Sequence, residues 1–62
     1  MEREIIYEFY TIGAVVKVTA LDVATITEVS VQGPASAGEA ALKQAAYNKL
    51  LYVLRKNGKI AE

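Results

Sequence analysis

Apolar and polar side chains alternate with a period of two through the first half of the chain, from Glu4 to Val31. This segment is rich in Ile, Val, Tyr and Thr, which favour β-strands, and it is interrupted at Gly13 and around Asp22, where turns are expected. The pattern predicts three short strands, at about residues 4–11, 14–21 and 25–32.

The alternation also predicts how these strands pair. If the chain reverses between residues 11 and 14, three apolar pairs face each other: Phe9 with Val16, Tyr7 with Val18, and Ile5 with Ala20. A second reversal between residues 22 and 25 extends this face into the third strand: Val16 beside Val31, Val18 beside Val29, and Ala20 beside Thr27. We therefore expect an antiparallel meander with one consistent core face.

The opposite face of this meander supports the same register. It pairs charges and hydroxyls across the strands: Glu8 with Lys17, Thr19 with Glu28, and Lys17 with Ser30. For the turns we expect four-residue loops, or a bulge at Gly13, because Ile12-Gly13 and Val23-Ala24 are poor centres for two-residue hairpins.

A helix should start shortly after the third strand. Gly33-Pro34 ends that strand because proline cannot donate a hydrogen bond to the sheet, and Ser36 and Glu39 have the spacing of a capping box. At the other end, Gly58 stands where a left-handed residue terminates a helix. These signals predict one helix over about residues 37–57.

Apolar side chains cover about half of this helix. They are Leu42, Ala46, Tyr47, Leu50, Leu51, Val53 and Leu54. The helix should be ~30 Å long and each strand ~26 Å, so one helix can lie across the whole sheet. We therefore predict an α+β fold, β-β-β-α, in which a three-stranded antiparallel meander of order 1-2-3 packs on one C-terminal helix. A single domain over residues 1–62 accommodates it.

The composition favours self-association. A chain of 62 residues is at the low end of what one hydrophobic core stabilises, yet 53% of its residues are hydrophobic. Cysteine and histidine are absent, which excludes disulfides and the commonest zinc sites, and we expect no metal. The second sheet face carries more apolar residues than a solvated face requires, and we interpret it, or the wide helix arc, as a subunit contact.

The charge pattern gives no strong pointer to a partner. Seven Lys and Arg balance seven Asp and Glu, so no net charge attracts nucleic acid or an anionic membrane. No segment is long and apolar enough to span a membrane, and Met1 leads into charged residues rather than into a signal peptide. We expect a cytoplasmic protein without a membrane partner.

The order of elements resembles the last four of the double-stranded-RNA-binding domain, whose plan is α-β-β-β-α. Lys43-Gln-Ala-Ala46, followed by Leu50 and Leu54, is similar to the alanine-rich second helix of that family, and Val16-Lys-Val-Thr19 resembles its first strand. The resemblance covers about residues 14–54 and implies a similar sheet-and-helix fold.

The residues that bind RNA in that family do not match here. Its lysine cluster stands at the start of this helix, where the chain has Gly38, Glu39 and Ala40, and Glu39 repels phosphate. Its first helix, which reads the minor groove, has no counterpart, because residues 1–5 are too short to form it. The resemblance therefore implies a fold rather than an activity.

The whole chain also resembles a family of short bacterial proteins of unknown function. The shared run extends from Glu4-Ile-Ile through Val16-Lys-Val-Thr-Ala20 and Thr27-Glu-Val-Ser30 to the helix. This resemblance implies a homodimer, formed side by side or with exchanged elements, and it implies no activity.

Groups that could carry catalysis are few. Acid-base catalysis needs positioned groups with tuned pKa values, and the chain offers scattered carboxylates and lysines. The segment Gly33-Pro-Ala-Ser-Ala-Gly38 lacks the lysine and the glycine spacing of a phosphate-binding loop. We expect no enzyme, no catalytic residue and no cofactor.

We therefore predict a non-catalytic homodimeric structural or protein-interaction module, whose protein partner the sequence does not identify. The expected interface residues are Tyr10, Val15, Ile26, Leu51 and Tyr52. The alternative is RNA binding through the basic helix end: Lys49, Arg55, Lys56 and Lys59. Cations at that end also interact favourably with the helix dipole whatever the function, and Tyr10, the best candidate for base stacking, suits a protein interface at least as well.

Overall fold

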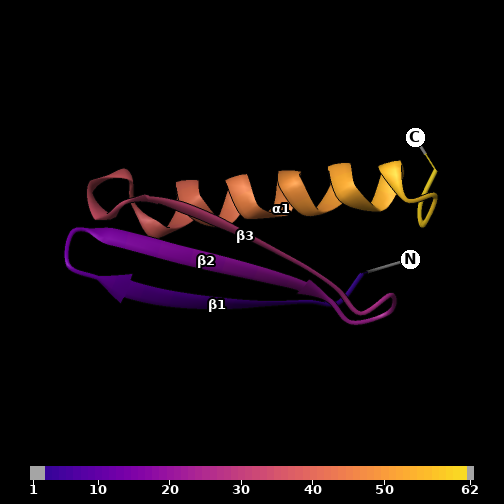
Figure 1. The fold of residues 1–62 in the computed structure, drawn as a ribbon, viewed down its shortest axis with the longest axis horizontal. Helices are drawn as coiled ribbons and strands as arrows, with labels where there is room; N and C mark the ends of the chain where they lie inside the picture. The colour runs from indigo at the N-terminus through magenta and orange to yellow at the C-terminus, as the bar shows by residue number, and fades with distance from the viewer. Residues whose placement is uncertain (1–2, 62) are drawn as a thin grey trace.

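The computed structural model describes residues 3–61, which form three strands, a short 3-10 turn and one helix (Figure 1). The elements are β1 (Ile5–Ile12), β2 (Val15–Asp22), β3 (Thr27–Pro34), η1 (Ala35–Ala37) and α1 (Glu39–Lys56). The sheet is antiparallel in the order β1-β2-β3, so the predicted β-β-β-α arrangement is confirmed. Each strand and the helix begin one or two residues later than predicted. The ends of the predicted domain, residues 1, 2 and 62, lie outside the described part.

The first hairpin differs from the predicted register by two residues. Phe9 lies opposite Val18 instead of Val16, and Tyr7 lies opposite Ala20 instead of Val18. The turn consists of two residues, and its first residue, Gly13, has a φ of 59°. A glycine with positive φ at this position is typical of a type II′ hairpin turn, so neither the expected four-residue loop nor a bulge is needed.

The second hairpin is displaced in the same way. Residues 23–26 form its turn, and Ala20 lies opposite Val29 instead of Thr27. A shift of two residues keeps every side chain on its predicted face, because strand side chains alternate with a period of two. The polar pairs do change. Glu8 lies opposite Thr19 rather than Lys17, and Thr19 lies opposite Ser30, to which its hydroxyl is hydrogen bonded at 3.2 Å.

The core lies between α1 and the part of the sheet formed by β2 and β3. Its buried apolar side chains come from both layers: Val16, Val18 and Ala20 of β2, Val29 of β3, and Leu42, Ala46, Leu50 and Leu54 of α1. The four helical residues follow one another at intervals of four, so they form a single stripe directed at the sheet. The predicted core face is therefore correct for β2, β3 and α1, and Ile5 and Tyr7 of β1 pack against the same cluster.

β1 is not covered in the same way. It forms the edge of the sheet away from α1, with β2 and β3 between them (Figure 1). Phe9 is on the core face, opposite Val18, but 39% of its surface remains exposed. The prediction that one helix covers the whole sheet was based on the length of the helix, but the width of the sheet determines whether β1 is covered. A helix is about 10 Å across, whereas three strands about 4.8 Å apart occupy roughly 14 Å.

The two ends of α1 behave differently. Its C-terminal end matches the prediction, because Gly58 has a φ of 71°, its N–H bonds to the carbonyl of Arg55 at 3.0 Å, and the N–H of Lys59 bonds to that of Leu54 at 2.8 Å. This is the Schellman motif. The predicted capping box is wrong. Gly38 occupies the N-cap position and none of the described side chains caps the helix, because η1 inserts a 3-10 turn that includes Ser36.

Candidate functional site

The face of the sheet opposite α1, which we call the outer face, combines apolar and polar residues. Its members are Ile6, Glu8, Tyr10 and Ile12 of β1, Val15, Lys17, Thr19 and Leu21 of β2, and Glu28, Ser30 and Gln32 of β3. Apolar pairs occupy its two ends: Ile12 opposite Val15, and Ile6 opposite Leu21. Among the large apolar side chains of the outer face, the two most exposed belong to β1, where Tyr10 is 64% and Ile12 is 61% exposed. An unpartnered face of this kind is typical of a contact surface.

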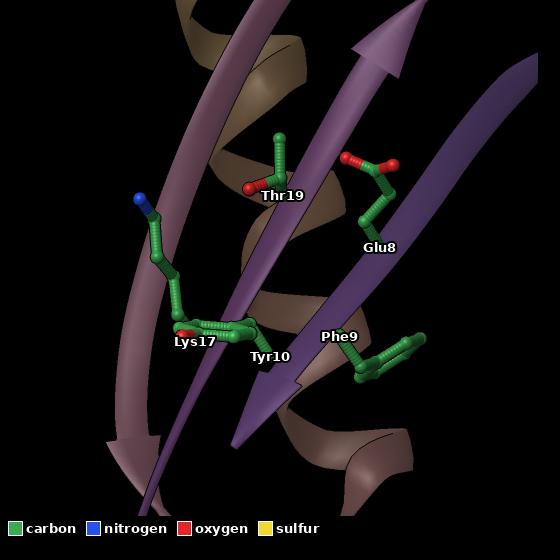
Figure 2. Close-up of a pocket in the computed structure, with 5 residues that line it drawn as sticks. All are labelled: Glu8, Phe9, Tyr10, Lys17 and Thr19. Carbon is green, nitrogen blue, oxygen red and sulfur yellow. The ribbon is translucent and has the colours of Figure 1, made fainter. Parts of the chain in front are cut away.

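A shallow hollow of ≈ 350 Å³ lies along the border of β1 and β2 (Figure 2). It is lined by Glu8, Phe9, Tyr10, Lys17 and Thr19. Tyr10 lies opposite Lys17, and Figure 2 shows the tyrosine ring beside the lysine stem. Among the described residues no ion pair joins Glu8 to Lys17. The hollow therefore presents one carboxylate, one ammonium and two hydroxyls to solvent, without the proton-transfer contact that acid-base chemistry uses.

The helix side of β1 holds a second group of side chains. Lys43 Nζ lies 4.7 Å from the centroid of the Tyr7 ring, a cation–π contact. Burial raises the pKa of Tyr7 above its ordinary value of 10.0, and the nearby Tyr47 raises it further. Leu51 is half-buried on α1, one turn after Tyr47. Phe9 lies on the same side of β1 as Tyr7 and is more exposed.

Asp22 is fully buried at the end of β2 and organises the turn that follows. Its Oδ2 accepts hydrogen bonds from the Thr25 hydroxyl at 2.6 Å and the Thr25 backbone N–H at 3.2 Å, and it pairs with Arg3 at 2.8 Å. The Thr25 hydroxyl lowers the pKa of Asp22 most, burial opposes this effect, and Arg3 lowers the pKa further. Oδ1 is buried and has no hydrogen-bond partner among the described residues.

This cluster was not identified from the sequence, although a signal for it exists. The hydroxyls of Thr25 and Thr27 are 2.7 Å apart, so Thr27 donates to the Thr25 oxygen whose proton is directed at Asp22. An aspartate followed three residues later by threonine is typical of a turn in which the carboxylate accepts backbone and hydroxyl protons. The cluster uses its polar groups to hold the turn.

The five predicted interface residues do not form one surface. Tyr10 and Val15 are exposed on the outer face, as predicted. Leu51 is half-buried on α1, and Tyr52 is exposed there. Ile26 was assigned to the third strand, which is wrong, because β3 begins at residue 27 and Ile26 lies in the preceding turn.

The predicted basic contact residues also separate. Lys49 is directed at the sheet, where its ammonium donates to the backbone carbonyl of Ser30 at 2.8 Å. The other three lie exposed at the C-terminal end of α1: Arg55, Lys56 and Lys59. The start of the helix carries the acidic Glu39 in its first turn. Of the four predicted contact residues, these three therefore share one end of α1 and Lys49 does not.

Two features do not occur within residues 3–61. Within that range no three side chains of the His, Cys, Asp or Glu type gather as metal ligands would. The helix there lacks the combination of length and apolarity that crossing a membrane requires.

A protein-family model that describes a domain of unknown function (DUF6898) matches residues 2–57, which include all three strands and the whole of α1. No curated protein and no solved structure matches the chain.

Proposed function

The chain belongs to the DUF6898 family of domains of unknown function, and we propose that it acts as a non-catalytic homodimeric interaction module. The observation that carries this proposal is the exposure of apolar side chains on both faces of one strand. Phe9 is exposed on the helix side of β1, and Tyr10 and Ile12 are exposed on its outer face. A strand with apolar residues on both faces is expected to be covered on both.

The shape of the single chain supports association. Its Cα radius of gyration is 12.0 Å, whereas a compact domain of this length has about 10.6 Å. Its extents are 36 × 18 × 17 Å, which describes an elongated body. A second copy alongside the long axis would make the assembly more compact and would bury apolar surface that one helix leaves open.

The side chains available for catalysis support the non-catalytic part of the proposal. The chain contains neither cysteine nor histidine. The hollow on the outer face is open, and the buried carboxylate of Asp22 is engaged by Thr25 and Arg3. Surfaces of this kind suit binding better than they suit a chemical reaction.

Sedimentation equilibrium of the purified chain at micromolar concentrations tests the proposal. We expect the mass of a dimer that dissociates reversibly on dilution. A folded monomer throughout this concentration range would overturn the proposal. Circular dichroism of the same samples separates folded monomer from unfolded chain.

The same samples test the alternative of RNA binding. Arg55, Lys56 and Lys59 are exposed, whereas Lys49 is engaged by Ser30. Nucleic-acid binding through this end should weaken steeply with salt, because bound cations displace counterions from phosphates. Amide spectra recorded with duplex and single-stranded oligonucleotides at low salt should show no shift at these residues. A salt-dependent shift there would favour the alternative.

A further inference from the structure

We propose that two copies of the chain pair through the free edge of β1, in antiparallel orientation, to form one continuous six-stranded sheet. This inference rests on the proposed homodimer and identifies the surface that forms it. It rests on two observations. Each edge of the sheet leaves some backbone groups unpaired, and side chains block the edge of β3 but not that of β1.

The pairing of β1 with β2 determines which of its backbone groups are free. The N–H of Val23 bonds to the carbonyl of Glu4 at 3.2 Å, and the two strands pair antiparallel without interruption. Bonded and non-bonded pairs alternate in such a ladder. The even-numbered residues of β1 therefore bond to β2. The N–H and C=O groups that point away from the sheet belong to Ile5, Tyr7, Phe9 and Thr11.

The opposite edge, formed by β3, is blocked. The N–H of Ala35 bonds to the carbonyl of Ala14 at 2.7 Å, so the same alternation directs the backbone groups of Ser30 and Gln32 outward. The Ser30 carbonyl is taken by the Lys49 ammonium at 2.8 Å. The strand ends at Pro34, which has no N–H to donate. A lysine over the edge and a terminal proline are devices that prevent strands from pairing with other chains.

The edge of β1 has no such protection among the described residues. Its eight residues carry a single charge, at Glu8, and no described side chain donates to its outward carbonyls. The Phe9 ring extends past the free side of the strand, away from β2 (Figure 2). A long apolar edge strand with free backbone groups is a template for another strand. Because an antiparallel strand is complementary to itself, a second copy satisfies both edges with one twofold axis.

The charge on β1 favours one register. An axis through Glu8 would place two carboxylates directly opposite each other, which is destabilising. An axis through Phe9 places Glu8 opposite Tyr10 of the second copy and Ile6 opposite its Ile12. In this register the Phe9 rings meet between the two α1 helices, because each helix packs mainly on β2 and β3 of its own chain and leaves Phe9 exposed.

A matched pair of proline variants tests the edge. Thr11 and Gln32 are both exposed, both have outward N–H groups, and they lie on opposite edges. Proline at either position removes no bond of the sheet, but it blocks the approach of another strand. We expect Thr11→Pro to raise the dimer dissociation constant at least about tenfold and Gln32→Pro to leave it unchanged. Circular dichroism checks that each variant keeps its helix.

Amide hydrogen exchange of the unmodified chain provides a second measurement. The amides of Tyr7, Phe9 and Thr11 should exchange slowly in the dimer and faster on dilution, whereas the amide of Gln32 should exchange at a rate independent of concentration. The Phe9-centred register leaves the Ile5 amide unpaired. Concentration-dependent protection of Ile5 would overturn that register.

The outcomes distinguish this inference from the proposal on which it rests. A monomeric wild-type chain overturns both. A wild-type dimer that Thr11→Pro leaves intact, or that Gln32→Pro disrupts, overturns the β1 edge and keeps the homodimer. Loss of the dimer in Thr11→Pro alone, with concentration-dependent protection of the Tyr7, Phe9 and Thr11 amides, supports the inference.

Discussion

Asp22 holds a negative charge inside the protein by means of a few close partners. The Thr25 hydroxyl and Arg3 favour the charged carboxylate and outweigh the effect of burial, so the pKa of Asp22 is below its ordinary 3.8. A carboxyl whose folded-state pKa is lowered stabilises the fold above about pH 4, and this contribution is lost as the pH falls through the folded-state pKa.

We therefore expect Asp22→Asn to lower the free energy of unfolding by roughly 1–3 kcal/mol at pH 7, because the bonds to Thr25 and Arg3 lose their ionic character. The difference from the wild type should shrink below pH 4. Urea unfolding at pH 7 and at pH 3 measures both effects. A variant as stable as the wild type at pH 7 would show that the cluster contributes no stability.

Ile26 illustrates local strain in a turn. It is a β-branched residue with a φ of 54°, a region that such residues rarely adopt, and 75% of its surface is exposed. Asparagine tolerates this conformation better, so Ile26→Asn should raise the free energy of unfolding by roughly 0.5–1 kcal/mol.

Thermal unfolding of Ile26→Asn measures this gain, and Ala24→Asn in the same turn is the control, because Ala24 has no positive φ to relieve. The two variants also address the predicted interface. If Ile26 contributes to the dimer contact, Ile26→Asn should weaken the dimer while Ala24→Asn does not. If the dimer forms through the edge of β1, as we propose, both variants should remain dimeric.

At the level of elements, the alternation of side chains predicted the strands and their faces but not their register. A shift of two residues leaves every side chain on the same face, so the pattern cannot distinguish Phe9 opposite Val16 from Phe9 opposite Val18. The turns make that choice. The positive φ of Gly13 permits a two-residue turn, and this backbone feature is not encoded in the apolar pattern.

The helix shows the same division between what was predicted and what was not. Its C-terminal signal, Gly58, depends on one residue at a defined position and was correct. The capping box formed by Ser36 and Glu39 was wrong, because the signal assumes that the helix starts directly after Ser36 and η1 lies there instead. The exposure of Phe9 on the helix side of β1 could not be predicted, because it depends on how far α1 reaches across the sheet.

Close packing between β3 and α1 leads to a prediction about Gly33. A Cβ added at this residue would lie 2.5 Å from Leu42 Cδ2, and Leu42 is buried. Gly33→Ala should therefore lower the free energy of unfolding by about 1–3 kcal/mol. Urea unfolding measures the loss, and Leu42→Val in the same background should recover part of it, because the shorter side chain leaves room for the new methyl group. Equal losses with and without Leu42→Val would contradict this contact.

At the level of the whole molecule, the proposed association would make stability depend on protein concentration. The excess of apolar residues was evident from composition, and the structure locates much of it along β1, in Phe9, Tyr10 and Ile12. Of the five predicted interface residues, only Tyr10 belongs to that strand, since Val15 is in β2, Ile26 precedes β3, and Leu51 and Tyr52 are in α1. The sequence showed that these residues are apolar and outside the predicted core, but only the packing of the layers shows which apolar residues share a surface.

A reversible dimer should unfold at a temperature that depends on protein concentration, because unfolding releases two chains from one assembly. For a chain of this length we expect the midpoint to rise by roughly 5–10 °C over a hundredfold increase in concentration. The midpoint of Thr11→Pro should depend less on concentration and stay closer to the value of the dilute wild type, whereas Gln32→Pro should follow the wild type. Differential scanning calorimetry measures all three. If the wild-type midpoint is independent of concentration, the chain unfolds as a monomer and the exposed surface of β1 serves a partner other than itself.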